Sequence, residues 1–156
     1  VHAGFLPESE DDPQRQIILQ RLGTIADVFA DRDIELALET GQETATTLLG
    51  VLEALAMPSL AVNFDPANMI LYGKGDPIEA ITALRDHVVQ VHVKDATATT
   101  TPGTWGSEVV VGTGDVDSPP FLSLVPAQAD LVLEREGGDD RVADIRRAHQ
   151  VVLESA

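Results

Sequence analysis

Four strand-like runs in this chain each end in a side chain that can bind a metal ion. The runs occupy residues 34–39, 60–65, 88–92 and 130–134, and they end at Glu39, Asp65, His92 and Glu134. If the runs form neighbouring parallel strands, their carboxyl ends meet at one edge of the sheet. The order of the runs therefore predicts that three carboxylates and one imidazole converge on a single small site.

The residues inside these runs indicate what each face of the sheet contacts. One and three positions before the ligand, the side chains are bulky and apolar: Leu38 and Leu36, Phe64 and Val62, Val91 and Val89, Leu133 and Leu131. Positions on the ligand's own face are small or polar at Ala37, Asn63 and Gln90, with Val132 as the exception. Because side chains alternate along a strand, one face should pack against helices and the other line a partly polar interior. A barrel with a polar mouth fits this pattern better than an open doubly wound sheet.

Helical patterns separate the strand-like runs, so the chain is predicted to alternate strands and helices. A first strand is expected over residues 1–6. Helices are predicted over 13–31, 43–56, 76–86 and 140–154, and Ser118-Pro119 is expected to open a shorter one. Asp76-Pro77 combines an N-cap residue with a proline at the first helical position, which is typical of a helix start.

The spacing of the ligands indicates repeated βα units. Glu39 and Asp65 are 26 positions apart, Asp65 and His92 are 27 apart, and His92 and Glu134 are 42 apart. The extra length falls in residues 96–117, a threonine- and glycine-rich stretch with Trp105 and the run GTGDVD inside it. Long loops at ligand-bearing strand ends commonly contact substrate, which makes Trp105 a candidate substrate-binding residue. The glycines of GTGDVD fit either a phosphate loop or, more commonly, a simple turn.

The composition excludes some classes of partner. The 156 residues include 10 basic and 26 acidic side chains, a net charge of −16. Such a surface repels phosphate polyanions, so no nucleic-acid partner is expected. No apolar stretch reaches the roughly 18 residues of a membrane span, so no membrane partner is expected. The absence of cysteine removes disulfides and thiolate ligands, and a cytoplasmic location is the default expectation.

The ligand types favour a hard or borderline divalent ion. Oxygen and nitrogen ligands without sulfur suit Mn²⁺, Mg²⁺, Co²⁺ or Zn²⁺, and three carboxylates favour Mn²⁺ or Mg²⁺. Such an ion binds adjacent carbonyl and hydroxyl oxygens of a sugar and stabilises an enediolate. Carboxylates beside the ion then take a proton from one carbon and return one elsewhere. Glu39 and Glu134, with two strands between them, are the natural pair for opposite faces of a substrate.

Each ligand also has a structural alternative. Asp65 precedes Pro66 and is a candidate helix cap, and His92 is a candidate core histidine with a hydrogen-bond partner. Glu39 and Glu134 are candidates for charges at a loop edge, and Glu136 competes with Glu134 because it shares its strand face. Four such coincidences at successive strand ends are less expected than one shared metal site.

Five segments together make the chain resemble a known group of proteins. LALETG, NFDPAN, VHVKD, GTGDVD and VLEREGGDD, in this order, resemble the xylose isomerase-like TIM-barrel superfamily of sugar phosphate isomerases and epimerases. The resemblance implies a (β/α)₈ barrel whose last four strands supply a glutamate, an aspartate, a histidine and a glutamate to a divalent metal. Those ligands are then Glu39, Asp65, His92 and Glu134. In the epimerase branch the two glutamates are also the acid–base pair.

The resemblance also implies residues that bind substrate. Asn68 stands where epimerases often have a histidine, so a proton-transfer role is not carried over to it. Lys94 and Asp95 fit an HxKD pattern, in which Lys94 either binds a substrate oxygen or phosphate or pairs with Asp95. His2 lies near the site by analogy.

The chain is short for a complete barrel, which typically has about 200 to 250 residues. Five strands are predicted over residues 1–156, and they would be the fourth to eighth of one partial TIM-barrel domain. We therefore expect either a fragment of a longer barrel or a homo-oligomer formed through the exposed strand edges.

Three functions are compatible with these features. The first is a metal-dependent isomerase or epimerase that moves a proton through an enediolate on a small carbohydrate or sugar phosphate. The second is a non-catalytic half-barrel that serves in binding or oligomerisation. The third is a metal hydrolase like the apurinic endonucleases, which the few histidines and the charge of −16 disfavour.

Overall fold

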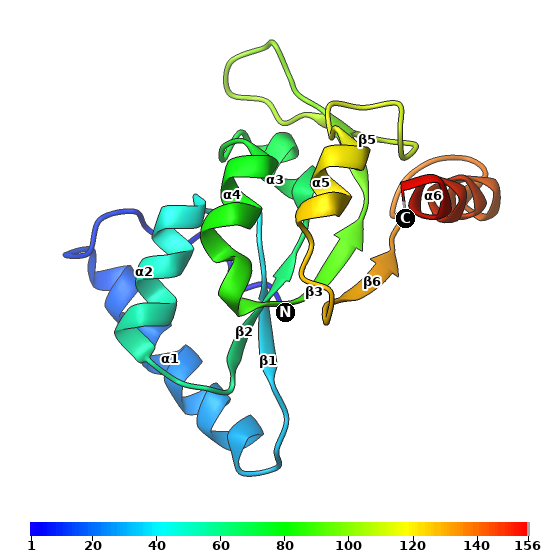
Figure 1. Ribbon diagram of the computed structural model, residues 1–156. Helices are drawn as coiled ribbons and strands as arrows, with labels where there is room; N and C mark the ends of the chain where they lie inside the picture. Colours follow the sequence, from blue (N-terminus) through cyan, green and yellow to red (C-terminus); the bar gives the residue numbers. More distant parts are fainter. Residues whose placement is uncertain (156) are drawn as a thin grey trace.

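The computed structural model describes residues 1–155, and its centre is a parallel sheet of four strands (Figure 1). The strand order follows the chain: β1 (Leu36–Glu39), β2 (Leu60–Phe64), β3 (Val88–Val93) and β6 (Asp130–Leu133). Sequential parallel strands with a helix in each connection are the repeating unit of a TIM barrel. The predicted α/β class, with parallel strands alternating with helices, is confirmed.

The helices lie close to their predicted positions. They are α1 (Pro13–Ala30), α2 (Ala45–Leu55), α3 (Pro66–Tyr72), α4 (Pro77–Leu84), a 3₁₀ turn η1 (Arg85–His87), α5 (Ser118–Leu124) and α6 (Arg141–Ser155). Side-chain caps explain several of the starts: Asp12 accepts from the backbone of Gln14, and Asp76 accepts from Ile78 and Glu79. Helix α3 was not predicted as a separate element.

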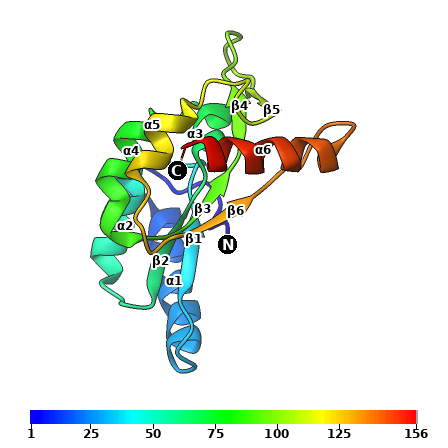
Figure 2. The ribbon, with the colours of Figure 1, turned by 45° about the vertical axis from the view of Figure 1, so that its right-hand side comes forward.

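The core lies between one face of the sheet and helices α1, α2, α4 and α5 (Figure 2). Leu38, Val62, Phe64 and Val91 are at most 1% exposed on the strands, and Phe64 packs on Phe121 of α5 with ring centroids 5.7 Å apart. This alternation was predicted, with two exceptions. Val89 is only partly buried, whereas its neighbour Val88 is buried in the core. Leu131 is 42% exposed, because α6 packs through Ala148 and Val151 onto Val93 and Val111 instead.

The predicted strand over residues 1–6 is not formed as a regular element. Val1 alone pairs with β1: its N-terminal ammonium donates to Ala37 O (2.7 Å), and its carbonyl accepts from Glu39 N–H (2.8 Å). These two bonds have the pattern of a parallel bridge. The chain then leaves the sheet at Gly4, whose φ of +82° favours glycine.

A two-stranded antiparallel hairpin follows β3 and was not predicted. It consists of β4 (Asp95–Thr97) and β5 (Ser107–Val109), and it rises above the carboxyl edge of the parallel sheet (Figure 1). Its connecting loop, residues 98–106, contains Trp105. The hairpin accounts for most of the extra length between His92 and Glu134.

Candidate metal centre

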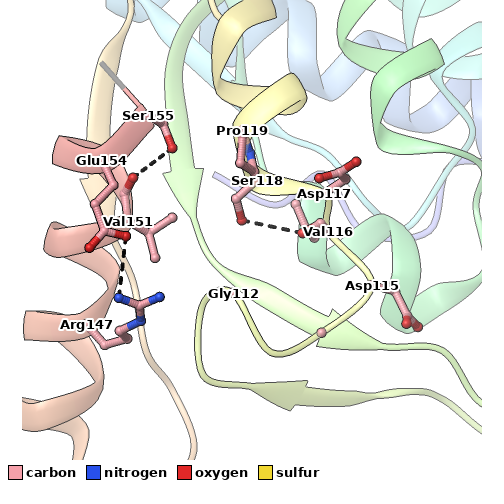
Figure 3. A pocket seen from close by; sticks show the side chains of 11 residues that line it. Gly112, Asp115, Val116, Asp117, Ser118, Pro119, Arg147, Val151, Glu154 and Ser155 are labelled. Atoms are coloured by element: carbon pink, nitrogen blue, oxygen red, sulfur yellow. Dashed lines mark hydrogen bonds and ion pairs between the residues drawn. The ribbon is translucent and has the colours of Figure 1, made fainter.

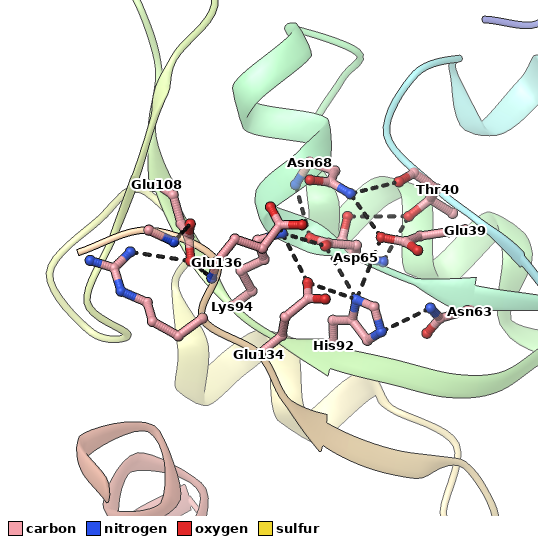
Figure 4. Close-up of polar contacts among 12 residues, drawn as sticks. Glu39, Thr40, Asn63, Asp65, Asn68, His92, Lys94, Glu108, Glu134 and Glu136 are labelled. Carbon is pink, nitrogen blue, oxygen red and sulfur yellow. Dashed lines mark hydrogen bonds and ion pairs between the residues drawn. The ribbon is translucent and has the colours of Figure 1, made fainter. Parts of the chain in front are cut away.

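The four predicted ligands come together at the carboxyl ends of the four parallel strands (Figure 4). Glu39 ends β1, Asp65 follows β2, His92 is the penultimate residue of β3, and Glu134 follows β6. One ligand atom from each residue lies within 4.8 Å of the other three. Because the strands are parallel and in sequential order, residues at equivalent strand positions meet at the same edge.

His92 Nδ1 faces all three carboxylates. It lies 3.1 Å from Glu134 Oε2, 3.4 Å from Asp65 Oδ2 and 3.5 Å from Glu39 Oε1. Burial disfavours the charged imidazole, but the hydrogen bond to Asp65 and the negative charges of Glu134, Asp65 and Glu39 outweigh burial. The pKa of His92 is therefore raised above its ordinary value of 6.5.

Asp65 caps a helix and faces the cluster at the same time. Its Oδ1 accepts the backbone N–H of Asn68 (2.9 Å), which caps the first turn of α3. Its Oδ2 points at His92. Thr40 fixes its backbone, since Thr40 Oγ1 accepts from Asp65 N–H (2.8 Å) and donates to Asp65 O (3.1 Å). The cap was weighed as an alternative to a site role, and the geometry allows both.

Two residues that were predicted to lie near the site, Asn68 and His2, contact the Glu39 carboxylate. Asn68 Nδ2 donates to Glu39 Oε1 (3.1 Å), and His2 Nε2 lies 3.4 Å from the same oxygen. Burial raises the pKa of Glu39, while the positive charges of His2 and His92 oppose this shift. Gly41 allows the close approach of Asn68, because a Cβ at residue 41 would overlap the Asn68 side chain.

Lys94 is buried beside the cluster and bonds to carboxylates other than Asp95. Its Nζ donates to Glu134 Oε2 (2.9 Å) and Glu136 Oε2 (3.1 Å) and lies 3.5 Å from Asp65 Oδ2. Burial opposes the charge on Lys94, but these carboxylates outweigh burial and raise its pKa. Glu136, weighed as a competitor of Glu134, is 69% exposed and is outside the four-residue cluster.

Asp95 has a structural role that settles how the GTGDVD run folds. Its carboxylate is fully buried and accepts backbone N–H groups from Ala96, Gly112, Gly114 and Val116 at 2.8–3.1 Å. A phosphate bound by this loop would need the same N–H groups. The run is therefore a turn held by Asp95.

The segment after Glu134 is held by an ion-pair network that sequence reasoning missed. Arg135 Nε donates to Asp144 (2.9 Å), and Arg135 Nη1 lies 3.2 Å from Glu108 Oε1 on β5. Glu108 also accepts the backbone N–H groups of Glu136 and Gly137. The hairpin thus fixes the position of the loop that carries Glu134 and Glu136. The charged run EREGGDD was the only sequence signal for this network.

Trp105 lies in the loop between β4 and β5 and makes none of the hydrogen bonds of the cluster. It is 65% exposed and packs edge-on against Tyr72 at the end of α3, with ring centroids 5.1 Å apart.

A separate cavity of about 450 Å³ lies between residues 112–119 and α6 (Figure 3). Asp115, Asp117 and Glu154 outnumber its one guanidinium, Arg147, so its charge does not favour an anion.

The donor set fits a divalent cation. Three carboxylate oxygens and one imidazole nitrogen are hard or borderline ligands, and atoms that share an ion at about 2.1 Å lie about 3–4 Å apart. His92 Nε2 is 2.9 Å from Asn63 Nδ2, and the buried Asn63 Oδ1 has no hydrogen-bond partner among residues 1–155. Asn63 was noted for its polarity inside a strand but was not predicted as a site residue.

Comparisons with known proteins agree with the fold. The family model described as xylose isomerase-like TIM barrel matches residues 1–154. An uncharacterized protein of Escherichia coli K12, YihM, is 30% identical over 111 residues, which cover 70% of this chain and 33% of YihM. The solved structure of a xylose isomerase domain protein from Planctomyces limnophilus is 34% identical, with a TM-score of 0.90 over 99% of this chain and 56% of that chain.

More distant structures share the fold alone. The probable 3-DHS dehydratase AsbF from Bacillus anthracis is 19% identical, with a TM-score of 0.78 over 97% of this chain and 61% of that chain. An L-ribulose 3-epimerase is 14% identical, with a TM-score of 0.68 over 97% and 59%. The chain therefore spans about a third of the curated relative and somewhat over half of these solved proteins. Within residues 1–155, no helix is long and apolar enough to cross a membrane.

Proposed function

Because this chain belongs to the xylose isomerase-like TIM barrel family, we propose that it carries the metal centre of a sugar isomerase or epimerase. The observation that supports this proposal most strongly is the convergence of Glu39, Asp65, His92 and Glu134 within 4.8 Å. We further propose that residues 1–156 are one partial-barrel domain that corresponds to strands four to eight, with the first of these reduced to the bridge at Val1, and that the activity belongs to the protein containing it. The substrate class is a small carbohydrate or its phosphate.

The proposed mechanism assigns proton transfer to the two glutamates. When bound, a divalent ion, with Mn²⁺, Mg²⁺ or Co²⁺ favoured over Zn²⁺, supplies positive charge that stabilises negative charge on adjacent substrate oxygens. Glu39 takes the proton from a substrate carbon next to a carbonyl, which leaves an enediolate. Glu134, separated from Glu39 by strands β2 and β3, gives the enediolate a proton taken from solvent on the opposite side.

Neighbouring side chains orient this pair. Asn68 donates a hydrogen bond to Glu39 Oε1, and His2 lies close to the same oxygen. These contacts leave Glu39 Oε2 to face the substrate. Lys94 is bonded to Glu134 and is proposed to bind a substrate oxygen or phosphate from that side. Trp105 is proposed to contact the distal part of a substrate at the rim, where its ring is exposed.

Solvent exchange at carbon tests the reaction. The protein is loaded with Mn²⁺ and incubated in D₂O with a panel of ketoses and ketose phosphates, and deuterium at carbon is followed by NMR and mass spectrometry. We expect exchange with wild type and its loss in Glu39→Gln and Glu134→Gln. Glu136→Gln is the matched control, because Glu136 also bonds to Lys94 but lies outside the cluster. Absence of exchange from the metal-loaded protein would count against the proposal.

Measurements of bound metal and of molecular mass in solution distinguish a non-catalytic half-barrel from an enzyme. A chain that takes up no metal, catalyses no exchange and is monomeric in solution contradicts the enzyme proposal. For the endonuclease-like alternative, the decisive measurement is affinity for abasic DNA at moderate salt. The excess of 26 acidic over 10 basic side chains predicts that none is found.

A further inference from the structure

Whether His92 can bind a metal ion depends on which ring nitrogen carries the proton. A neutral imidazole has one N–H, and a nitrogen that binds a metal ion has none. Because Nδ1 is the atom that faces Glu39, Asp65 and Glu134, metal binding there requires the proton to be on Nε2. The group that contacts Nε2 therefore decides whether the ring is ready to bind metal.

That group is the side-chain amide of Asn63, on β2 beside His92 (Figure 4). Asn63 is 5% exposed, and its Nδ2 lies 2.9 Å from Nε2. An amide nitrogen only donates hydrogen bonds, so this orientation makes Nε2 an acceptor and leaves the proton on Nδ1. A proton on Nδ1 faces the three carboxylates, but it occupies the lone pair that a metal needs.

The same amide can also support the metal-binding tautomer. Asn63 Oδ1 is buried and has no hydrogen-bond partner in the described part of the chain. The oxygen and nitrogen of an amide are nearly equal in size, so a half-turn about the last side-chain bond exchanges their positions. Oδ1 then accepts a hydrogen bond from Nε2–H, and Nδ1 presents its lone pair to the cluster.

We propose that Asn63 is a positioning residue that selects the metal-binding tautomer of His92: its Oδ1 accepts a hydrogen bond from Nε2–H, which leaves Nδ1 to bind a divalent ion. This inference rests on the proposed metal centre and adds an outer residue to it. Outer-sphere partners of metal-binding histidines commonly change affinity by about 10- to 100-fold when they are removed.

Metal titration of three variants tests the inference. Asn63→Leu keeps the approximate shape but removes the acceptor, and we expect Mn²⁺ affinity measured by calorimetry to fall about 10- to 100-fold. Asn63→Asp keeps an acceptor and should retain at least wild-type affinity. Gln90→Leu is the matched control, because Gln90 is the register partner of Asn63 on β3 and is only half-buried. It should bind Mn²⁺ like wild type.

Nitrogen NMR of histidine-labelled protein gives a readout independent of affinity and of the stability of the variants. With Zn²⁺ bound to wild type, we expect His92 Nε2 to carry a proton and Nδ1 to be the metal-bound nitrogen, with assignment by His92→Gln. An unprotonated Nε2 in the zinc-loaded protein, or wild-type Mn²⁺ affinity in folded Asn63→Leu, overturns the inference alone. A wild-type protein that binds neither ion overturns both the inference and the proposed function.

Discussion

Lys94 Nζ lies 2.9 Å from Glu134 Oε2, so a buried ammonium group is bonded to one of the proposed metal ligands. The same ammonium lies 3.5 Å from Asp65 Oδ2. Lys94 thus neutralises part of the negative charge that attracts a cation to the site. This arrangement couples the side chain proposed to bind substrate to the affinity of the site for metal.

Replacing Lys94 with methionine is expected to strengthen metal binding. Removing a positive charge a few ångströms from two ligands makes the site more negative, and we expect Mn²⁺ affinity to rise about tenfold or more. Turnover should fall, because the substrate loses its proposed partner. Calorimetric titration measures the first effect. Lys74→Met is the control, since Lys74 pairs with Glu8 rather than with a proposed ligand. Weaker Mn²⁺ binding by Lys94→Met would contradict this charge argument.

Metal binding is expected to weaken as the pH falls. His92 must lose its proton to bind an ion, and its pKa is raised above 6.5 by the three carboxylates around Nδ1. Protons therefore compete with metal below that raised pKa, where affinity should fall by about tenfold per pH unit for one displaced proton. Mn²⁺ titrations at several pH values, in buffers of different ionisation enthalpy, measure both affinity and proton release. Affinity that is constant from about pH 5 to pH 8 would disprove the competition.

Glu43 is expected to make stability depend on pH. Its residue is 3% exposed, and burial raises the pKa of its carboxyl from 4.5 to about 7, although Lys74 opposes the shift. The folded state therefore binds a proton that the unfolded state has lost, so stability is lost as the pH rises from about 4.5 to about 7. Above that window the buried charge costs about 3 kcal/mol.

Glu43→Gln removes this charge while keeping the shape. We expect the variant to gain up to about 3 kcal/mol over wild type at pH 8 and little at pH 5, as measured by urea denaturation. Glu53→Gln, at an exposed position of α2, should change little at either pH. A gain of equal size at both pH values would show that burial of the charge is not the cause.

Gly41 is expected to tolerate no side chain, for two separate reasons. Its φ is +127°, and a Cβ there would overlap Asn68. We expect Gly41→Ala to lose about 3 kcal/mol or more of unfolding free energy and to weaken metal binding, because Asn68 orients Glu39. Gly73→Ala is the control: its φ is +63°, but a Cβ there meets open space, so about 1 kcal/mol is expected. Equal losses in chemical denaturation would mean that the overlap with Asn68 is relieved without cost.

Local patterns in the chain were sufficient for most of the fold. Alternating apolar positions located β1, β2, β3 and β6, and N-cap residues with prolines located most helix starts within a few residues. Helix α3 was not predicted, because Asp65 was interpreted as a ligand or a cap and the residues after it were not interpreted as a helix. The β4–β5 hairpin depends on pairing across residues 98–106, for which threonine- and glycine-rich sequence provides no clear period. The expected cytoplasmic location and homo-oligomer stay predictions.

The sequence by itself determined which ligand types are present and at which strand ends, because strand period and chain order depend on local residue choice. Only the tertiary structure decided what those residues contact. Asp65 was shown to cap α3 and face His92 at once, and Lys94 to bond to Glu134 and Glu136 rather than Asp95. Asn63, a polar residue in a buried strand, acquired a partner only when β3 was placed beside β2. Apart from the Asp65–Asn68 cap, these contacts join residues 27 to 42 positions apart. They depend on strand register and side-chain direction, which local pattern does not specify.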